Sequence, residues 1–355
     1  MKPFQHLKVI ELASVLAGPS VGLFFAELGA TVIKIENKNT GGDVTRSWKL
    51  ASEIKEHPYS AYYSSVNAGK QSLFMDLKNE EDRTLLFKEI ETADVIIANF
   101  KPGDAKKLGL DFKSLKEIND TIIYGEITGF GAVNRTAYDV VLQAESGFLS
   151  MSGTAEGELC KMPVALIDLL AAHHLKEGLL LALLEFQQES KAIKVSVSLL
   201  DAALASLANQ ATNWLMGQHI AQPMGTLHPN IAPYGELFTC KDGKQIVLAI
   251  GRNSQFSNLC EVLKCEQVAL NEKFKSNQAR LSNRTELAKH LKLAIAGFER
   301  SALMTLFIEK KVPAGAVRNM KEVFELPEAQ NRLVHSEKEG RAMTSVQGNA
   351  FCISY

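Results

Sequence analysis

The 355-residue sequence predicts an α/β protein built on a mostly parallel β-sheet. Three observations predict this class. Short β-branched runs alternate with segments of helical apolar spacing. A proline and a glycine bracket the first such helix. Hydrophobic residues make up 46% of the chain and charged residues 22%, which provides a core of ordinary globular size. Strands that alternate with helices form parallel sheets covered on both faces.

A βαβ unit opens the chain. Residues 7–12 form the first expected strand, and 21–28 have the apolar spacing of a helix. Pro19 fits the first turn of that helix and Gly29 ends it. The β-branched run 31–36 is the second expected strand.

The same alternation continues after this unit. An amphipathic helix is expected over 80–93, a buried strand over 94–99 and another strand over 121–126. Two long apolar helices are expected over 169–188 and about 197–216.

The pattern of residue types changes near residue 222, where prolines cluster. A hairpin over 237–250 turns at Asp242-Gly243, and short polar helices follow it. We therefore expect a large α/β domain with its connecting helices over 1–221, a smaller α+β domain over 222–318, and a return to the large domain over 319–355.

Charge and cysteine content exclude several classes of protein. Lys and Arg number 39 against 40 Asp and Glu, so no bulk basicity indicates nucleic acid or an anionic membrane as a partner. Five cysteines without a CxxC pair are typical of reduced thiols in the cytoplasm. The apolar stretch 12–26 contains a proline and is too short to span a bilayer. We expect a soluble cytoplasmic protein.

Common cofactor motifs are missing. No GxGxxG lies between the first strand and helix, which disfavours NAD even though Glu36 ends the second strand. GxxxxGK[ST], HExxH and GxSxG are also absent. The adjacent His173 and His174 point to different sides of their helix, so a shared metal is disfavoured.

Cations instead gather in loops that should follow strands. In an open α/β sheet ligands bind at the carboxyl ends of the strands, where cations suit a phosphorylated cofactor. Solvated surface side chains are the alternative interpretation, and composition alone favours it. The cations are Lys34, Lys38, Arg46, Lys70, Lys78, Lys101, Lys106, Lys107 and Arg135.

Asp168 is the most informative single residue. It follows the strand-like run 162–167 and precedes the expected helix 169–188. A carboxylate at this junction is either the N-cap of the helix or a partly desolvated nucleophile. The residues by themselves leave both roles open.

Several motifs occur in order along nearly the whole chain. They are Leu-Ala-Gly-Pro at 16–19, Leu-Gly-Ala-Thr-Val-Ile-Lys-Ile-Glu at 28–36, Gly-Gly-Asp at 41–43, the Gly-Lys-Gln-Ser and Met-Asp-Leu-Lys run at 69–78, Ala-Asp-Val-Ile-Ile-Ala-Asn-Phe-Lys-Pro-Gly at 93–103, Thr-Gly-Phe-Gly at 128–131, Tyr-Asp-Val-Val-Leu-Gln-Ala at 138–144, the segment around Asp168, and Ser-Leu-Leu-Asp-Ala-Ala at 198–203. In these motifs the chain resembles the class III CoA-transferases, which include formyl-CoA and carnitine CoA-transferases.

The resemblance implies an open Rossmann-like large domain, a smaller domain, and two chains interlocked as a homodimer. It implies that Asp168 is the nucleophile and that Asp139 orients the acceptor. Coenzyme A would be bound as the acyl-CoA substrate, with no metal and a small carboxylate as acceptor. By position the CoA contacts would be Leu16, Ala17, Lys38, Met75, Asp76, Leu77, Lys78, Asn99, Phe100, Lys101, Lys107, Arg135, Thr136, Ala137 and Tyr138.

The chain departs from the family pattern in three places. Asn37 followed by Lys38 stands where some members place an arginine that holds the adenosine end. The glycine-rich loop over the active site of formyl-CoA transferase has no counterpart, and the C-terminal segment is expected to be shorter than in many members.

In the family mechanism the aspartate attacks the acyl-CoA carbonyl to give a mixed anhydride, and an aspartyl-CoA thioester follows. An α-methylacyl-CoA racemase is the alternative within the same fold, but that subgroup has a histidine where this chain has Tyr138, and tyrosine is a poor base at neutral pH. A CoA-binding protein without catalysis is a further alternative.

Overall fold

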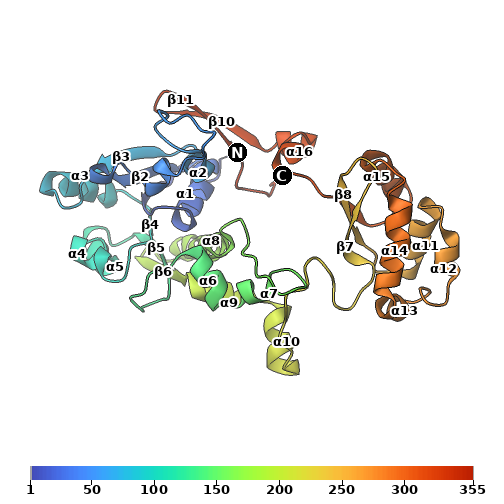
Figure 1. Ribbon diagram of the computed structural model, residues 1–355. Coiled ribbons are helices and arrows are strands. Elements are labelled where there is room, and N and C mark those ends of the chain that lie inside the picture. Colours follow the sequence, from blue (N-terminus) through green and yellow to red (C-terminus); the bar gives the residue numbers. More distant parts are fainter. Residues whose placement is uncertain (1, 355) are drawn as a thin grey trace. The chain divides into compact units, whose positions relative to one another are not determined.

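The computed structural model describes residues 2–354, and its largest element is a six-stranded sheet (Figure 1). All neighbouring strands are parallel, in the order β3-β2-β1-β4-β5-β6. This is the strand order of the Rossmann fold, so the predicted fold class is confirmed. The strands are β1 Lys8–Leu12, β2 Thr31–Asn37, β3 Gln71–Met75, β4 Val95–Ala98, β5 Ile123–Thr128 and β6 Ile193–Ser198.

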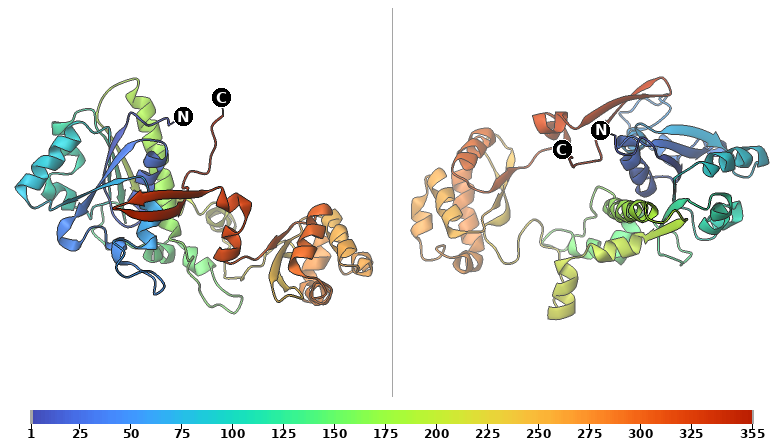
Figure 2. Two further views of the ribbon diagram at one scale, coloured as in Figure 1. Left: turned by 90° about the horizontal axis from the view of Figure 1, so that it is seen from above. Right: turned by 180° about the vertical axis from the view of Figure 1, so that it is seen from behind.

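Helices cover both faces of the sheet (Figure 2). Because successive strand residues point to opposite faces, Val9 packs with helices α1 (Ala17–Glu27) and α8 (Leu166–Phe186). Its neighbour Ile10 packs with α3 (Glu80–Glu91) and α5 (Phe112–Ile118) on the other face. The strands are therefore buried on both sides, which explains their continuous apolar runs.

The expected βαβ opening is confirmed. Helix α1 ends at Glu27, and Gly29 follows with φ +102°, a conformation that favours glycine. Later expectations over 80–93, 94–99 and 121–126 correspond to α3, β4 and β5.

Two expected elements are wrong. Residues 162–167 form no strand, because the Met162 N–H donates to the Gln143 side chain and α8 already begins at Leu166. The expected helix over 197–216 is broken. Its start belongs to β6, and it continues as α9 (Leu199–Ala205) and α10 (Asn209–Gly217), which are separated by Ala208 at φ +49°.

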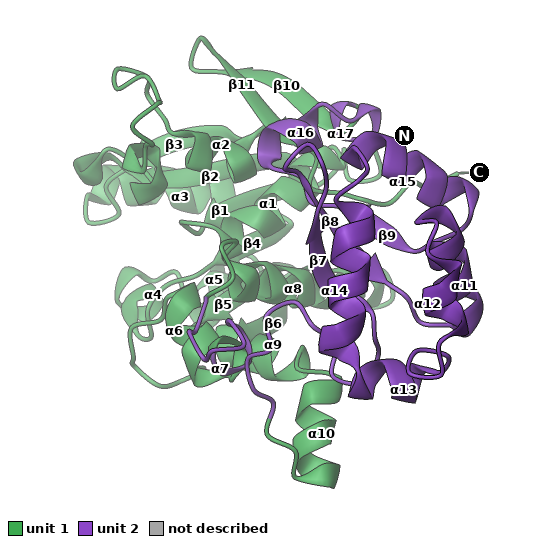
Figure 3. Cartoon of the chain, turned by 45° about the vertical axis from the view of Figure 1, so that its right-hand side comes forward, with its two compact units in different colours: residues 1–149, 161–220, 331–355 green, residues 150–160, 221–330 purple. Residues whose placement is uncertain are grey.

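The chain divides into two compact units (Figure 3). The first comprises the described residues up to 149, 161–220, and those from 331 onward, and contains the parallel sheet. Its other elements are η1 Lys38–Thr40, η2 Val44–Ser47, α2 Ala61–Asn67, α4 Asp104–Leu108, α6 Asp139–Glu145, β10 Leu333–Lys338 and β11 Arg341–Val346. The short helix α7 Phe148–Met151 spans the boundary at residue 149.

The second unit comprises residues 150–160 and 221–330 and has its own core of buried apolar side chains. The expected hairpin is present as β7 (Tyr234–Thr239) and β8 (Gln245–Ala249). The further elements are α11 Asn253–Val262, α12 Glu266–Leu270, α13 Asn277–Ser282, α14 Arg284–Ile295, α15 Arg300–Glu309, β9 Ala314–Ala316, α16 Met320–Phe324 and α17 Pro327–Gln330. The boundaries 1–221, 222–318 and 319–355 stay predictions as folding domains.

The antiparallel hairpin β10–β11 returns the chain to the first unit. The Tyr59 hydroxyl lies 3.2 Å and 3.1 Å from the carbonyl oxygens of Lys338 and Arg341, to which it donates. Met343 is buried in a small cluster with Leu23 and Tyr63. Over residues 2–354, no helix is both long enough and apolar enough to cross a membrane.

Candidate active site

Two adjoining hollows lie at the carboxyl ends of the strands, where an open α/β sheet binds its ligands. The first, of about 550 Å³, is lined by the ends of β2 and β3 and by the segment that follows β2. The second, of about 370 Å³, is lined by the loops after β1, β4 and β5 and by the first turn of α8. Ser14, Val44 and Phe100 line both hollows.

The structure brings most of the predicted site residues to these hollows. The first contains Met75, Asp76, Leu77, Lys78 and Phe100. The second contains Leu16, Ala17, Asn99, Phe100, Lys101, Arg135, Thr136, Ala137, Tyr138, Asp139 and Asp168. Their contacts with CoA stay predictions.

Two predicted cations are not among the residues that line either hollow. Lys38 Nζ lies 2.6 Å from Asp82 Oδ2, and Lys107 Nζ lies 2.8 Å from Asp104 Oδ1. Both ion pairs are partly exposed. A phosphate would have to compete with a carboxylate for either lysine.

The loop between β1 and α1 is held from two sides. The Asn99 side chain accepts from the Ser14 N–H at 3.0 Å and donates to the Ser14 carbonyl at 2.8 Å. The next residue, Val15, has φ +72°. A β-branched residue rarely adopts this left-handed conformation, which costs about 1–3 kcal/mol and is often found at functional sites.

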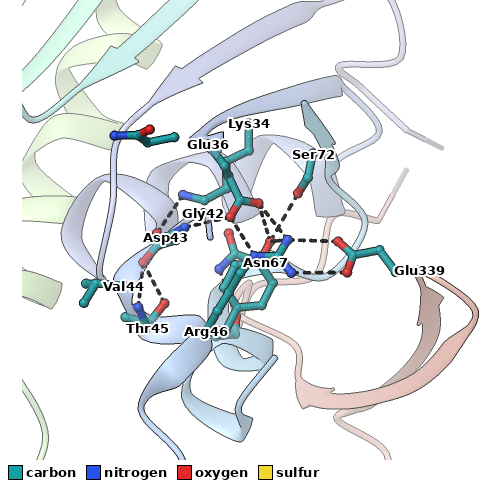
Figure 4. Close-up of polar contacts among 12 residues, drawn as sticks. Lys34, Glu36, Gly42, Asp43, Val44, Thr45, Arg46, Asn67, Ser72 and Glu339 are labelled. Atoms are coloured by element: carbon teal, nitrogen blue, oxygen red, sulfur yellow. Dashed lines mark hydrogen bonds and ion pairs between the residues drawn. The ribbon is translucent and has the colours of Figure 1, made fainter. Parts of the chain in front are cut away.

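Asp43 holds the strained Val15. Its carboxylate oxygens accept from the Val15 N–H at 3.2 Å and 3.4 Å, and one of them accepts from the Thr45 N–H at 3.0 Å. Lys34 Nζ lies 3.0 Å from the other oxygen of Asp43 (Figure 4). Asp43 therefore joins the β1–α1 loop to the segment after β2.

Three of the cations singled out from the sequence are buried in ion pairs, including Lys34, which lines the first hollow. Lys34 pairs with Glu11 at 2.8 Å, and Lys70 pairs with the same carboxylate at 2.6 Å. Arg46 pairs with Glu36 at 2.7 Å (Figure 4). The interpretation of these three as a phosphate site is wrong, because charges buried this deeply need a fixed counter-charge.

Burial and pairing shift the pKa values of this network. Burial alone would raise the pKa of Glu36, but hydrogen bonds from Arg46 and Ser72 lower it to about 2. Burial lowers the pKa of Lys70 to about 8 although Glu11 favours its charged form. Glu36 also explains why residue 42 is a glycine, since a Cβ there would lie 2.5 Å from the Glu36 carboxylate.

Asp168 is the third residue of α8, is half-buried and lines the second hollow. Burial raises its pKa to about 7, and the nearby carboxylate of Asp139 contributes to the rise. Asp168 is not the N-cap. Ala165 occupies that position, and the Asp139 carboxylate accepts from the Ile167 N–H at 2.7 Å. The capping interpretation of Asp168 is therefore wrong.

Two aromatic residues at the site were missed by sequence reasoning. Trp48 lines the second hollow, and its ring packs against that of Tyr62 at 5.2 Å between centroids. Burial raises the pKa of Tyr62 to about 12, and the carboxylates of Asp168, Asp139 and Asp43 add to this. Neither residue has a spacing signal, since Trp48 lies in an irregular segment and Tyr62 in a seven-residue helix.

The described part of the chain contains no group of three or more His, Cys, Asp or Glu side chains that could hold a metal ion.

Comparison with known proteins gives a consistent result. The sequence model of the family described as CoA-transferase family III matches residues 4–355. The chain is 36% identical over 353 residues to the succinate–glutarate CoA-transferase of Agrobacterium fabrum, covering 98% of this chain and 88% of the relative. It is 34% identical to the human succinyl-CoA:glutarate CoA-transferase, covering 92% and 74%.

Another relative, the acetyl-CoA:oxalate CoA-transferase of Acetobacter aceti, is 31% identical, covering 94% of this chain and 86% of the relative. Among solved structures, a CaiB/BaiF family protein from Brucella suis aligns with a TM-score of 0.88 at 34% identity, covering 99% of this chain and 93% of that one.

Proposed function

The chain belongs to CoA-transferase family III, and we propose that Asp168 is the nucleophile with which it moves CoA from a dicarboxylic acyl-CoA to a second dicarboxylic acid. The chain is an enzyme of the CoA-transferase class, and CoA thioesters are the substrates of that activity. The role of Asp168, the choice of acids and the residues that bind CoA are the proposal.

The observation that carries the proposal is the state of Asp168. Its carboxyl group is half-buried beside a hollow at the carboxyl edge of the sheet, with a pKa raised to about 7. A more basic carboxylate is a better nucleophile, and partial burial removes water that would compete for it.

The proposed reaction proceeds through acyl exchange at Asp168. The carboxylate attacks the thioester carbonyl and the C–S bond breaks. CoA leaves as a thiolate, and Asp168 and the first acid remain joined as a mixed anhydride. The thiolate attacks the aspartyl carbonyl, releases the first acid and leaves an aspartyl-CoA thioester. The acceptor carboxylate attacks this thioester and displaces CoA to form a second anhydride. Attack of the thiolate on the acceptor's carbonyl then releases the new acyl-CoA and restores Asp168.

We assign the thioester end of CoA to the second hollow, beside Asp168, and its phosphates to the cations that line the two hollows. Lys78 lines the first hollow, and Lys101 and Arg135 line the second. Exposed cations of this kind bind phosphate by charge-assisted hydrogen bonds. Lys38, Lys107 and Arg135 would contribute only after leaving Asp82, Asp104 and Glu145.

The substrate class comes from the relatives. By their names, two of the relatives above exchange CoA between succinate and glutarate, and the third uses acetyl-CoA and oxalate. Succinate, glutarate and oxalate are dicarboxylic acids. We propose succinyl-CoA as the donor and a short dicarboxylate such as glutarate as the acceptor.

We further propose a cytoplasmic homodimer. Helix α10 supports the dimer, because Trp214, Leu215 and Met216 are 51%, 74% and 87% exposed there, and clustered exposed apolar side chains mark interaction surfaces. The odd number of cysteines, without a CxxC pair, supports the cytoplasm.

The test combines turnover with trapping. Succinyl-CoA is offered with a panel of mono- and dicarboxylates, and new thioesters are identified by mass spectrometry. Incubation with succinyl-CoA and hydroxylamine should convert Asp168 to a hydroxamate, with Asp168→Asn as the unlabelled control. Labelling elsewhere, or near-normal turnover of Asp168→Asn, would contradict the nucleophile. Exchange of the α-proton without acyl transfer would indicate the racemase, and CoA binding without any turnover would indicate a binding protein.

A further inference from the structure

We infer that Asp139 is a positioning residue for the transfer reaction, because its carboxylate caps the first turn of α8 and keeps its negative charge beside Asp168. This inference rests on the proposed role of Asp168 as the nucleophile. It assigns to Asp139 a role in setting the basicity of the nucleophile, whereas the sequence led us to expect a contact with the acceptor.

The geometry of the cap is specific. Asp139 is the first residue of α6, and its Oδ1 accepts from the Ile167 N–H at 2.7 Å and from the Asp168 N–H at 3.3 Å. The first amides of a helix have no partner within the helix and need one from outside it. Here the partner lies 28 residues earlier in the chain from Ile167.

A buried glutamine holds the other oxygen of this carboxylate. Gln143, which is 1% exposed, donates to Asp139 Oδ2 at 2.5 Å and accepts from the Met162 N–H at 2.9 Å. With three donors directed at it, Asp139 acts only as an acceptor, which is the property of an ionised carboxylate.

This arrangement separates the two carboxylates by role. The amides of Ile167 and Asp168 are used by Asp139, so they do not stabilise the charged form of the Asp168 side chain. The negative charge of Asp139 opposes ionisation of Asp168, as does burial. Asp168 therefore keeps a basicity well above that of an ordinary aspartate.

Three other groups around Asp168 are neutral or already have a partner. Tyr62 on α2 has a pKa raised to about 12 by burial and by nearby carboxylates, so it is neutral at working pH. Arg135 in the same hollow is paired with Glu145 at 2.5 Å. On α9, Asp201 is hydrogen-bonded to Ser198 at 2.6 Å.

Three further charged groups lie on elements around Asp168. Lys101 is exposed in the loop after β4 and lines the same hollow. Asp43 is engaged by Lys34 and by the Val15 amide. Glu27, the one titratable residue of α1, is at the opposite end of that helix from the site.

The experiment separates charge from capping. Asp139→Asn keeps a capping oxygen and removes the charge, Asp139→Ser does the same with another good cap, and Asp139→Glu keeps the charge. Asp111→Asn is the matched control, since Asp111 caps α5 through the Lys113 and Ser114 amides and lines neither hollow. Thermal unfolding confirms that each variant is folded.

Two readouts are compared. In the profile of kcat/KM against pH, the apparent pKa of the acid limb should decrease by about one unit in Asp139→Asn and Asp139→Ser. It should stay near the wild-type value in Asp139→Glu and Asp111→Asn. Carboxyl ¹³C NMR, with the Asp168 signal assigned by its loss in Asp168→Asn, should show the same shift without any turnover.

An unchanged Asp168 titration in both uncharged variants would overturn the inference while hydroxylamine labelling of Asp168 still supported the proposed function. If wild-type Asp168 is not labelled, the proposed function fails, and the NMR titration still decides whether Asp139 sets the pKa of Asp168.

Discussion

The amide of Val15 donates to the carboxylate of Asp43, which lies 28 residues further along the chain, at 3.2 Å. Val15 occupies the left-handed region at φ +72°, and the same carboxylate is the counter-charge of the buried Lys34. Asp43 thus holds the strained Val15 loop of the candidate site and also serves as a counter-charge for the buried Lys34.

Replacing Asp43 with Ala should destabilise the protein by ~3 kcal/mol, because it leaves Lys34 with one counter-charge fewer and releases the Val15 loop. Urea denaturation measures this loss. The exposed pair partner Asp104 is the control, and its Ala variant should unfold at the wild-type urea concentration. Equal stability of the two variants would contradict the assigned role of Asp43.

Asp168→Asn should be more stable than the wild type above pH 7. The folded wild type holds the Asp168 proton up to pH about 7, whereas the unfolded chain loses it near its ordinary value of 3.8. Between these values the folded state binds more protons, so wild-type stability falls as pH rises. The asparagine variant lacks this loss.

The melting temperature of Asp168→Asn should therefore exceed that of the wild type by about 2–4 °C at pH 8. The difference should shrink toward pH 4, which scanning calorimetry at several pH values measures. A difference that is constant with pH would mean that Asp168 does not titrate as described.

Lys101→Ala should raise the KM for acyl-CoA roughly fivefold, since this cation lines the second hollow and is exposed to solvent. Arg135→Ala should raise it less, because Arg135 in the same hollow is paired with Glu145. The effect should weaken at high salt because screening reduces the contribution of exposed charges. Lys116→Ala on α5 is the control and should leave KM unchanged. Unchanged KM in both hollow variants would show that the CoA assignment is misplaced.

Leu215→Glu should weaken self-association. Leu215 and Met216 are exposed apolar residues on α10, and a charge placed in an apolar interface is costly. Sedimentation velocity should show a dimer for the wild type and a shift toward monomer or misassembled protein for the variant. A well-folded wild-type monomer at nanomolar concentration would refute the dimer.

The sequence by itself determined the sheet and where its ligands should lie. Continuous apolar runs such as 94–99 are long enough for a strand buried on both faces, and Pro19 and Gly29 mark the ends of α1. The order of motifs along the chain identified the family, because such motifs follow local constraints on turns and strand ends.

Only the tertiary structure decided which charges are free and which carboxylate does what. From the sequence, Lys34 and Arg46 are available cations. In the structure both are buried and paired, Lys34 with Glu11 and Arg46 with Glu36. Arg46 also donates to Glu339, which lies 293 residues away in the chain. No local pattern encodes a pairing at that separation.

The same reason explains how the roles of Asp139 and Asp168 are divided. The local pattern left Asp168 as either the cap of α8 or a nucleophile, but packing brings Asp139 from another helix to the Ile167 amide. Asp168 is thereby left half-buried with a raised pKa. A pKa depends on burial and on neighbouring charges in space, and the folded chain alone sets both.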